Sequence, residues 1–230
     1  MKIRGILFDK DGTLFDFHQT WVVWFDLVIS ELSGGDAALK LKLAESCGFD
    51  LPEQRFVAGS LIVIATAQEV NNALMACLPA ISEAEIDAVA RKHLANLPHF
   101  PVCDLRPLLE LLRTRGFILG LATNDYVEGA EVQLQEAGVR DLFDFICGYD
   151  SGFGAKPGPG MIKGFCAKTG LRPAEVAVVG DSVHDLEAGQ AAQVALNIGV
   201  LTGPATISEL HPASDVVLAD ISGIPELLAG

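Results

Sequence analysis

The sequence predicts an α/β protein whose parallel sheet is interrupted, after its first strand, by a long helical segment. Residues 3–8, "IRGILF", form a mostly apolar run of the kind that makes a strand buried on both faces. Residues 17–97 carry apolar residues at helical spacing almost throughout. After residue 98, short strand patterns alternate with helix patterns, which is typical of a parallel sheet with helices on both faces.

The elements after residue 98 follow one another in a regular order. Apolar periodicity predicts helices, and a shorter apolar run bounded by turn residues follows each of them. The expected pairs are helix 105–116 with strand 117–125, helix 126–138 with strand 143–148, helix 158–170 with strand 176–181, and helix 182–192 with strand 194–200, before a last strand at 215–218. We therefore expect a Rossmann-like parallel sheet core.

The inserted segment is predicted to be all-helical. Helical spacing is found in four stretches, 18–32, 36–48, 57–79 and 82–98. Ser82 and Glu85 have the spacing of a capping box at the start of the fourth stretch. The predicted domains are an α/β core formed by residues 1–15 and 98–230, and a helical cap formed by residues 16–97. Such an insertion is tolerated at an exposed loop because the two ends of the loop stay in place.

The composition is that of a folded globular protein. Half of the 230 residues are hydrophobic and 20% are charged, which is enough to build a sizeable core. The apolar runs, such as 61–67, fall far short of the roughly 18 residues that span a bilayer. The first residues lack the long apolar segment of a secretory signal. We expect a cytoplasmic monomer or homodimer that does not act at a membrane.

Charge and cysteine content argue against further classes. The formal net charge is −14, and a field of this sign repels nucleic-acid phosphates, so no nucleic-acid partner is expected. A small anionic ligand would need a local lysine and backbone N–H groups to counter the field. The five cysteines are widely spaced and form no C-x-x-C motif, so we expect reduced and mostly buried thiols.

Polar side chains follow several of the predicted strands at the point where each strand ends. In chain order they are Asp9 and Asp11, Thr123 and Asn124, Lys156, and Asp181 with Asp185. Ligands of an open parallel sheet bind beyond the carboxyl ends of its strands, so these side chains are expected to share one site. Taken alone, Asp9 and Asp11 leave three alternatives open: a solvated turn, a metal site, or a nucleophile with an acid/base partner.

The same residues resemble the motifs of the haloacid dehalogenase-like phosphatases. The matching segments are "DKDGT" at 9–13, "ATND" at 122–125, "KP" at 156–157 and "GDSVHD" at 180–185, in the order and spacing of that family. The helical insertion lies where the family places its smaller cap, in an arrangement similar to the phosphoglycolate phosphatase branch. The resemblance implies a Mg²⁺-dependent phosphatase that hydrolyses a small phosphorylated metabolite, of phosphoglycolate or sugar-phosphate type, through an aspartyl-phosphate.

The resemblance also implies roles for the acidic residues. Asp9 would be the nucleophile, and Asp11 the acid/base that protonates the leaving alcohol and then accepts a proton from water. The protein ligands of Mg²⁺ would be the carboxylates of Asp9 and Asp181 and the backbone carbonyl of Asp11, all oxygen donors, as this cation prefers. Asp185 would hold the metal shell through water or a neighbouring residue.

The remaining motif residues would hold the phosphate group. Gly12 permits a tight turn that brings backbone N–H groups close to the phosphate. Thr123, by its hydroxyl, and Asn124, by its backbone N–H, would contact phosphate oxygens. Lys156 would supply the local positive charge that the acidic chain otherwise lacks. The resemblance thus implies a catalytic as well as a phosphate-binding role for Thr123 and Lys156.

Three rival functions stay open at this point. A phosphomutase of the same fold shares every core motif. A haloacid dehalogenase would need the nucleophile but neither Asp11 as acid/base nor the metal, and a non-catalytic binding protein would not need the complete set of reacting groups. Two residues depart from the family pattern: Lys10 fills a position that is usually apolar, and Phe17 replaces a residue that is often small. We expect both near the mouth of the site, where they bear on substrate choice.

Overall fold

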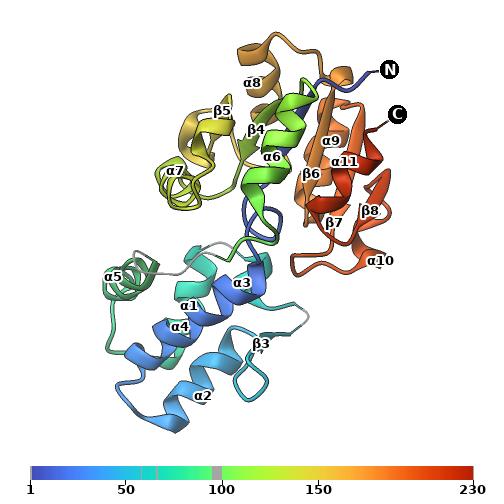
Figure 1. The fold of residues 1–230 in the computed structure, drawn as a ribbon. Helices are drawn as coiled ribbons and strands as arrows, with labels where there is room; N and C mark the ends of the chain where they lie inside the picture. Colours follow the sequence, from blue (N-terminus) through green and yellow to red (C-terminus); the bar gives the residue numbers. More distant parts are fainter. Residues whose placement is uncertain (1, 58, 66, 95–99, 230) are drawn as a thin grey trace. The chain divides into compact units, whose positions relative to one another are not determined.

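The structure is a computed structural model that describes residues 2–57, 59–65, 67–94 and 100–229. The chain divides into two compact units, drawn in Figure 1. Unit 1 comprises Met1–Phe17 and His99–Gly230, and unit 2 comprises His18–Pro98. The predicted domain boundary between residues 97 and 98 lies outside the described residues, so the predicted division stays a prediction.

Unit 1 is built on a six-stranded parallel sheet with the order β5-β4-β1-β6-β7-β8. Its strands are β1 (Gly5–Phe8), β4 (Ile118–Ala122), β5 (Phe145–Cys147), β6 (Val176–Gly180), β7 (Leu196–Val200) and β8 (Val216–Leu218). β1 pairs with β4 on one side and β6 on the other, so that Phe8 lies opposite Leu121 and Val179. The predicted parallel core is confirmed. The strand order reverses beside β1, which is where open sheets of this type bind their ligands.

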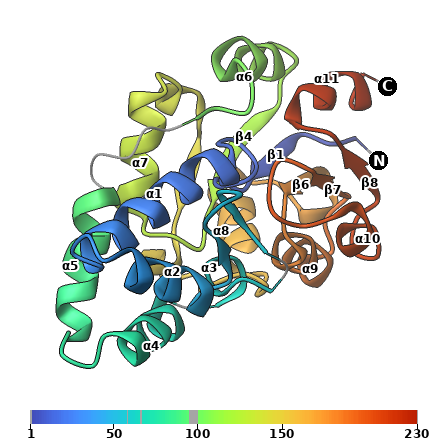
Figure 2. The same cartoon turned by 90° about the horizontal axis from the view of Figure 1, so that it is seen from below.

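Helices cover both faces of this sheet. They are α6 (Leu105–Thr114), α7 (Val127–Glu136), α8 (Gly160–Thr169), α9 (Val183–Ala192), α10 (Ile207–Leu210) and α11 (Ile224–Leu227), with short 3₁₀ turns at Arg140–Leu142, Tyr149–Ser151, Pro173–Glu175 and Ile221–Gly223. Ile6 and Phe8 pack with α6, α7 and α11, whereas Leu7 packs with α8 and α9. Figure 2 shows α6 and α11 on one side of the central strands and α8 and α9 on the other. Successive side chains of a strand point to opposite faces, and both faces are apolar because both are covered.

The chain leaves and re-enters unit 1 through two adjacent segments. The N–H of Asp16 donates to the carbonyl of Phe100 (2.7 Å), and the N–H of Val102 donates to the carbonyl of Leu14 (3.0 Å). These bonds keep the two ends of the long insertion side by side. The insertion therefore interrupts the sequence of the sheet without separating its strands.

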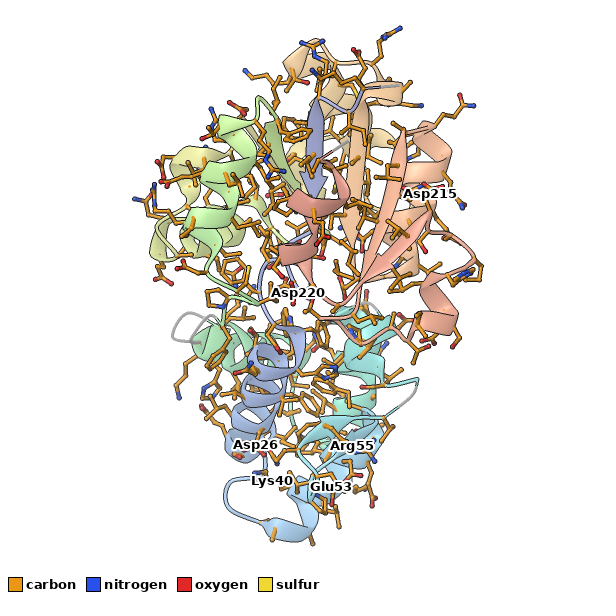
Figure 3. All side chains as sticks on the ribbon, turned by 45° about the vertical axis from the view of Figure 1, so that its right-hand side comes forward. Asp26, Lys40, Glu53, Arg55, Asp215 and Asp220 are labelled. Carbon is orange, nitrogen blue, oxygen red and sulfur yellow. The ribbon has the colours of Figure 1, made fainter. Side chains whose placement is uncertain are left out.

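Unit 2 consists mainly of helices. They are α1 (Phe17–Leu32), α2 (Ala37–Ser46), α3 (Leu61–Ile64), α4 (Ala67–Cys77) and α5 (Glu83–Leu94). The predicted capping box before α5 is confirmed, because Glu85 accepts from the N–H of Ser82 (2.9 Å) and donates its own N–H to the Ser82 hydroxyl (3.4 Å). Lys40 of α2 pairs with Asp26 of α1 at 2.8 Å, and both residues are labelled in Figure 3. The end of the fourth helical stretch, predicted over residues 82–98, lies outside the described residues.

The insertion is not entirely helical, which corrects one prediction. Phe49–Asp50 (β2) and Arg55–Phe56 (β3) form a short antiparallel hairpin. The rings of Phe49 and Phe56 have centroids 5.4 and 6.2 Å from that of Phe25 in α1. Burying these aromatic rings together favours the two very short strands, a contact that helical periodicity does not reveal.

The stretch 57–79, which carries helical spacing, does not form one continuous helix. It is divided into α3 and α4, and Ala65 between them has an extended backbone. The sequence of α3 is rich in β-branched residues, which lose side-chain freedom in a helix and so limit its length.

Among the described residues, no helix is long and apolar enough to cross a membrane.

Candidate active site

The central strand β1 brings Asp9 to the carboxyl edge of the sheet. The N–H of Asp9 donates to the carbonyl of Val179 in β6 (2.8 Å), which continues the sheet pairing one residue past the strand. Thr123 follows β4 and Asp181 follows β6, on either side of β1. These strands run parallel, so their ends bring together residues that are far apart in the sequence.

A tight turn carrying Gly12 follows Asp9. The carbonyl of Lys10 accepts the N–H of Leu14 (2.9 Å), which closes the turn. Gly12 has a φ of +81°, a conformation that favours glycine. The carbonyl of Gly12 accepts a hydrogen bond from the hydroxyl of Thr202 (2.6 Å), which follows β7. The turn is therefore held both by its own backbone and by a neighbouring strand end.

Gly12→Ala is expected to destabilise the protein. A Cβ at residue 12 would lie 2.3 Å from Oδ2 of Asp181, and a left-handed backbone costs an L-residue roughly 1–2 kcal/mol by itself. Gly116→Ala is the matched control, because Gly116 has a φ of +89° and an added Cβ would meet nothing within 4 Å. In chemical denaturation we expect a larger loss of unfolding free energy for Gly12→Ala, since Asp181 must move. Equal losses in the two variants would contradict the close contact.

Three carboxylates lie together at this edge of the sheet. Asp9, Asp181 and Asp185 each offer an oxygen within 4.8 Å of the others, and Asp181 and Asp185 are almost fully buried. Burial raises the pKa of Asp9 to about 7, with Lys156 opposing the rise and Asp185 adding to it. Burial, followed by the charges of Asp9 and Asp185, raises the pKa of Asp181 well above its ordinary value. The ionised forms of Asp9 and Asp181 are therefore disfavoured in the metal-free protein.

Lys156 brings a buried positive charge to the cluster. Its Nζ lies 2.5 Å from Oδ1 of Asp9 and 2.5 Å from Oδ1 of Asp185, and it donates to the carbonyl of Ala122 at 3.0 Å. Burial by itself would lower the pKa of Lys156, but Asp185 and Asp9 outweigh burial and raise it above its ordinary value. Lys156 therefore stays charged and supplies the local cation that an anionic ligand would need.

The side chain of Asn124 holds the Lys156 segment in place. Its Oδ1 accepts the N–H of Lys156 (2.8 Å), and its Nδ2 donates to the carbonyl of Lys156 (3.0 Å). Thr123 is buried, and its hydroxyl oxygen accepts the N–H of Asp125 (3.1 Å). The predicted contact of Asn124 with phosphate involves its backbone N–H alone. Sequence spacing carries no signal for the side-chain contact, because the two residues are 32 positions apart.

Asp185 has a partner on each of its two oxygens. Oδ2 accepts from the N–H (3.1 Å) and the hydroxyl (2.6 Å) of Ser182 at the start of α9, while Oδ1 accepts from Lys156. An acid in the first turn also suits the helix dipole. Asp185 thus stabilises the start of α9 and orients Lys156. Its expected place near a metal stays a prediction.

The carboxylate of Asp11 pairs with Lys10 and is not part of the three-carboxylate cluster. Its Oδ2 pairs with Nζ of Lys10 at 2.7 Å, and Lys10 also contacts Asp125 (3.2 Å) and Gln133 (2.6 Å). Burial would lower the pKa of Lys10, but the carboxylates of Asp11 and Asp125 outweigh it and raise the pKa. The expectation that Lys10 lies at the mouth of the site is wrong, because its side chain is buried.

The donor set of the cluster fits a divalent cation. Asp9, Asp181 and Asp185 offer carboxylate oxygens, the ligands that Mg²⁺ prefers. Burial first, and the neighbouring carboxylates after it, raise the pKa values of Asp9 and Asp181, and a bound cation would oppose both effects by stabilising the ionised carboxylates. The three residues could therefore hold a metal ion, whose identity belongs to the proposed function.

Thr202 and Gly203 also contribute to the site and were not predicted. Thr202 bonds the carbonyl of Gly12, and a Cβ at Gly203 would lie 1.7 Å from Oδ2 of Asp181. The backbone at Gly203 therefore packs directly against that carboxylate. Their position just after β7 is the signal that could have identified them, since the other site residues also follow strands.

Comparison with known proteins agrees with this fold. A family model for haloacid dehalogenase-like hydrolases matches residues 3–193. The chain belongs to the haloacid dehalogenase-like hydrolases. The predicted resemblance, including its phosphoglycolate phosphatase-like branch, is confirmed, as is the prediction of an enzyme of this class.

Relatives are similar over most of their length. Probable phosphatase IndB of Dickeya dadantii (strain 3937) is 28% identical, with 94% of this chain and 88% of the relative covered. Pyrophosphatase PpaX of Oceanobacillus iheyensis is 27% identical, with 97% and 96% covered. A solved structure of a predicted phosphoglycolate phosphatase from Haemophilus somnus 129PT has a TM-score of 0.74 at 21% identity, covering 99% of this chain and 98% of that one. A putative beta-phosphoglucomutase from Thermotoga maritima also has a TM-score of 0.74, at 19% identity and 99% coverage of both chains. These two structures share the fold.

Proposed function

We propose that this hydrolase is a Mg²⁺-dependent phosphatase that acts on a small phosphorylated metabolite through an aspartyl-phosphate on Asp9. The observation that carries the proposal is a three-carboxylate cluster at one sheet edge, with Nζ of Lys156 only 2.5 Å from Asp9. Attack of a carboxylate on a phosphate brings two anions together. Lys156 supplies one positive charge, and a bound Mg²⁺ would supply the rest by polarising phosphate oxygens.

In this proposal the residues around the cluster divide into metal ligands and phosphate ligands. The carboxylates of Asp9 and Asp181 and the backbone carbonyl of Asp11 would hold Mg²⁺, with Asp185 supporting them. Phosphate oxygens would be held by Lys156, the hydroxyl of Thr123 and the backbone N–H of Asn124, while the positive φ of Gly12 lets the turn approach the phosphate.

The proposed reaction has two steps. An oxygen of Asp9 bonds to phosphorus as the bond to the leaving alcohol breaks, and Asp11 gives the alcohol its proton. Water then attacks phosphorus, Asp11 takes a proton from the water, and Asp9 is released. The contact of Asp11 with Lys10 at 2.7 Å supports this division of roles, because it keeps the Asp11 carboxylate apart from the three acids of the cluster.

A phosphomutase is the second candidate, favoured by the fold likeness to the Thermotoga maritima protein. It would use the same nucleophile, acid/base and metal, so these residues do not separate the two reactions. A haloacid dehalogenase is less well supported, because that reaction needs neither the acid/base Asp11 nor the carboxylate cluster. A non-catalytic binding protein is also less well supported, because it would need no nucleophile placed 2.5 Å from a buried lysine.

A substrate screen tests the proposed function. Purified protein with Mg²⁺ is incubated with a panel of phosphorylated metabolites that includes 2-phosphoglycolate, sugar phosphates and pyrophosphate. Because Asp9, Asp11 and Lys156 act on the shared phosphate group, we expect release of inorganic phosphate from at least one phosphomonoester. Isomerisation of a hexose 1-phosphate is followed in parallel. Isomerisation without phosphate release would favour the mutase, and neither reaction would contradict both candidates.

We also propose that residues 1–15 and 98–230 act as the catalytic core and residues 16–97 as its cap domain, supported by the division into two compact units. A cytoplasmic location is supported by the five cysteines, which are all free thiols. The protein is proposed to be a monomer or homodimer, which light scattering on the purified protein can test.

A further inference from the structure

Lys10 is a buried lysine whose ammonium group has three polar neighbours. Its side chain is only 1% exposed. Nζ lies 2.7 Å from Oδ2 of Asp11, 3.2 Å from Oδ2 of Asp125 and 2.6 Å from Oε1 of Gln133. An ammonium group carries three protons to donate, so these partners match its capacity. The side chain is therefore held in one place and does not extend toward a ligand.

A buried ammonium group is a costly way to fill this position of the fold. Taking an ammonium out of water carries a large penalty, and well-packed apolar residues often replace buried ion pairs with no loss of stability. Gln133, the Lys10 partner on α7, is itself buried. Two buried polar side chains thus meet beside the site turn. The arrangement acts directly on Asp11, the residue that Lys10 contacts in the turn.

The contact with Lys10 distinguishes the two oxygens of Asp11. Oδ2 is paired with the ammonium group of Lys10. Oδ1 is buried and, among the described residues, has no hydrogen-bond partner. A carboxyl group held through one oxygen has a defined plane, and Oδ1 is the oxygen of Asp11 that is not used in this contact. Oδ1 is therefore the oxygen that can pass a proton to or from a reacting group.

Asp125 connects this contact to the phosphate-binding loop. Its Oδ2 faces Lys10, its Oδ1 accepts the N–H of Tyr126 (2.7 Å), and its own N–H donates to the hydroxyl of Thr123 (3.1 Å). Lys10 thus joins the turn after β1, which carries Asp11, to the loop after β4, which carries Thr123. A single ammonium group sets the position of one segment against the other.

We propose that Lys10 is a positioning residue that holds Asp11 with Oδ1 directed at the leaving oxygen. This inference rests on the proposed phosphatase function. In the first step an oxygen of Asp9 bonds to phosphorus, the bond from phosphorus to the leaving oxygen breaks, and the proton on Oδ1 of Asp11 passes to that oxygen. In the second step a water oxygen bonds to phosphorus, the bond to Asp9 breaks, and a water proton passes to Oδ1. Oδ2 stays on Lys10 in both steps.

The test compares two phosphate esters whose leaving groups differ in their need for a proton. p-Nitrophenolate leaves readily without one, whereas the alkoxide of an alkyl phosphate requires protonation. The measured quantity is kcat/KM, which covers the steps up to departure of the leaving group. Lys10→Met keeps the length of the side chain and removes the ammonium group. We expect its kcat/KM to fall about 100-fold for the alkyl phosphate and less than about tenfold for p-nitrophenyl phosphate.

Two further variants calibrate this result. Lys168→Met removes an exposed lysine of α8 and is expected to leave both esters unchanged. Asp11→Asn is expected to show the same selectivity as Lys10→Met with a larger loss. Equal losses for both esters in folded Lys10→Met, or no loss, would overturn the inference while the phosphatase assignment stands. Wild-type protein that hydrolyses neither ester would overturn the proposed function and this inference with it.

If thermal melting shows that Lys10→Met does not fold, the two esters are compared in Gln133→Leu instead. It keeps Lys10 and Asp11 and removes one of the three partners that hold the ammonium group. We expect a smaller loss than in Lys10→Met, about tenfold, again confined to the alkyl phosphate. A folded Gln133→Leu variant that loses activity equally on both esters, or on neither, would refute the positioning role.

Discussion

Asp9→Asn is expected to abolish phosphate release while the protein stays folded. An amide oxygen is a poor nucleophile, so we expect kcat to fall by at least about 10⁴-fold, as when other enzymes lose their nucleophile. The backbone bond from residue 9 to Val179 does not involve the side chain and should survive. Phosphate release under saturating substrate, with circular dichroism as the check on folding, measures both parts of this prediction.

Glu187→Gln is the matched control for this variant. It removes an acid from the exposed side of α9, the helix that also carries Asp185, and should leave turnover unchanged. Normal turnover in Asp9→Asn would refute the assignment of the nucleophile. Trapping of a phosphorylated wild-type enzyme by acid quench, with no such species in Asp9→Asn, would support it directly.

The same substitution should change how stability depends on pH. Burial raises the pKa of Asp9 to about 7 from an ordinary value of 3.8. Without metal, the native state therefore holds a proton that the unfolded state has lost between about pH 4 and pH 7. The contribution of Asp9 to the free energy of unfolding is therefore largest below about pH 4, and it is lost as the pH rises through about 7. We expect metal-free Asp9→Asn at pH 8 to melt at or above the wild-type temperature.

Removal of divalent metal is expected to stop phosphate release, and added Mg²⁺ to restore it. The buried cluster of Asp9, Asp181 and Asp185 has one nearby lysine, Lys156, which cannot balance three carboxylates. A ligand that binds only the native state at about 100 times its dissociation constant adds about 2.7 kcal/mol of stability, which corresponds to a rise of about 5–10 °C in Tm for a protein of this size. EDTA titration and thermal melting measure the two effects.

The metal effect should weaken as the pH falls. Protons compete with Mg²⁺ for Asp9 and Asp181, and the pKa of each is raised in the metal-free protein. The apparent dissociation constant for Mg²⁺ is therefore expected to rise as the pH falls below about 7. Turnover that persists in excess EDTA, or a melting temperature that does not change when Mg²⁺ is added, would rule out the proposed metal site.

Much of the core could be predicted because its signals are local in the chain. A strand needs a short apolar run and a helix needs apolar residues at a helical spacing, and both can be read within a dozen residues. Parallel strands end at one edge of a sheet, so polar residues after successive strands must meet there. This rule correctly placed Asp9, Thr123 and Asp181 at the ends of three adjacent strands.

Other features needed contacts between distant residues and could not be predicted. The hairpin of unit 2 depends on Phe49 and Phe56 packing on Phe25, and the local pattern of apolar residues does not reveal these contacts. Asn124 hydrogen-bonds the backbone of Lys156, 32 positions away in the sequence. A contact over this separation produces no periodic pattern from which it could be predicted.

Lys10 shows most clearly where local information ends. Sequence alone indicated that a turn follows the first strand here, and the family resemblance implied roles for the neighbouring residues Asp9 and Asp11. The position of Lys10 within the motif suggested that it lies near the mouth of the site. Only the folded chain brings Gln133, more than a hundred positions away, within 2.6 Å of its ammonium group. The direction of a long side chain depends on which partners can satisfy its charge, and those partners are assembled by tertiary structure.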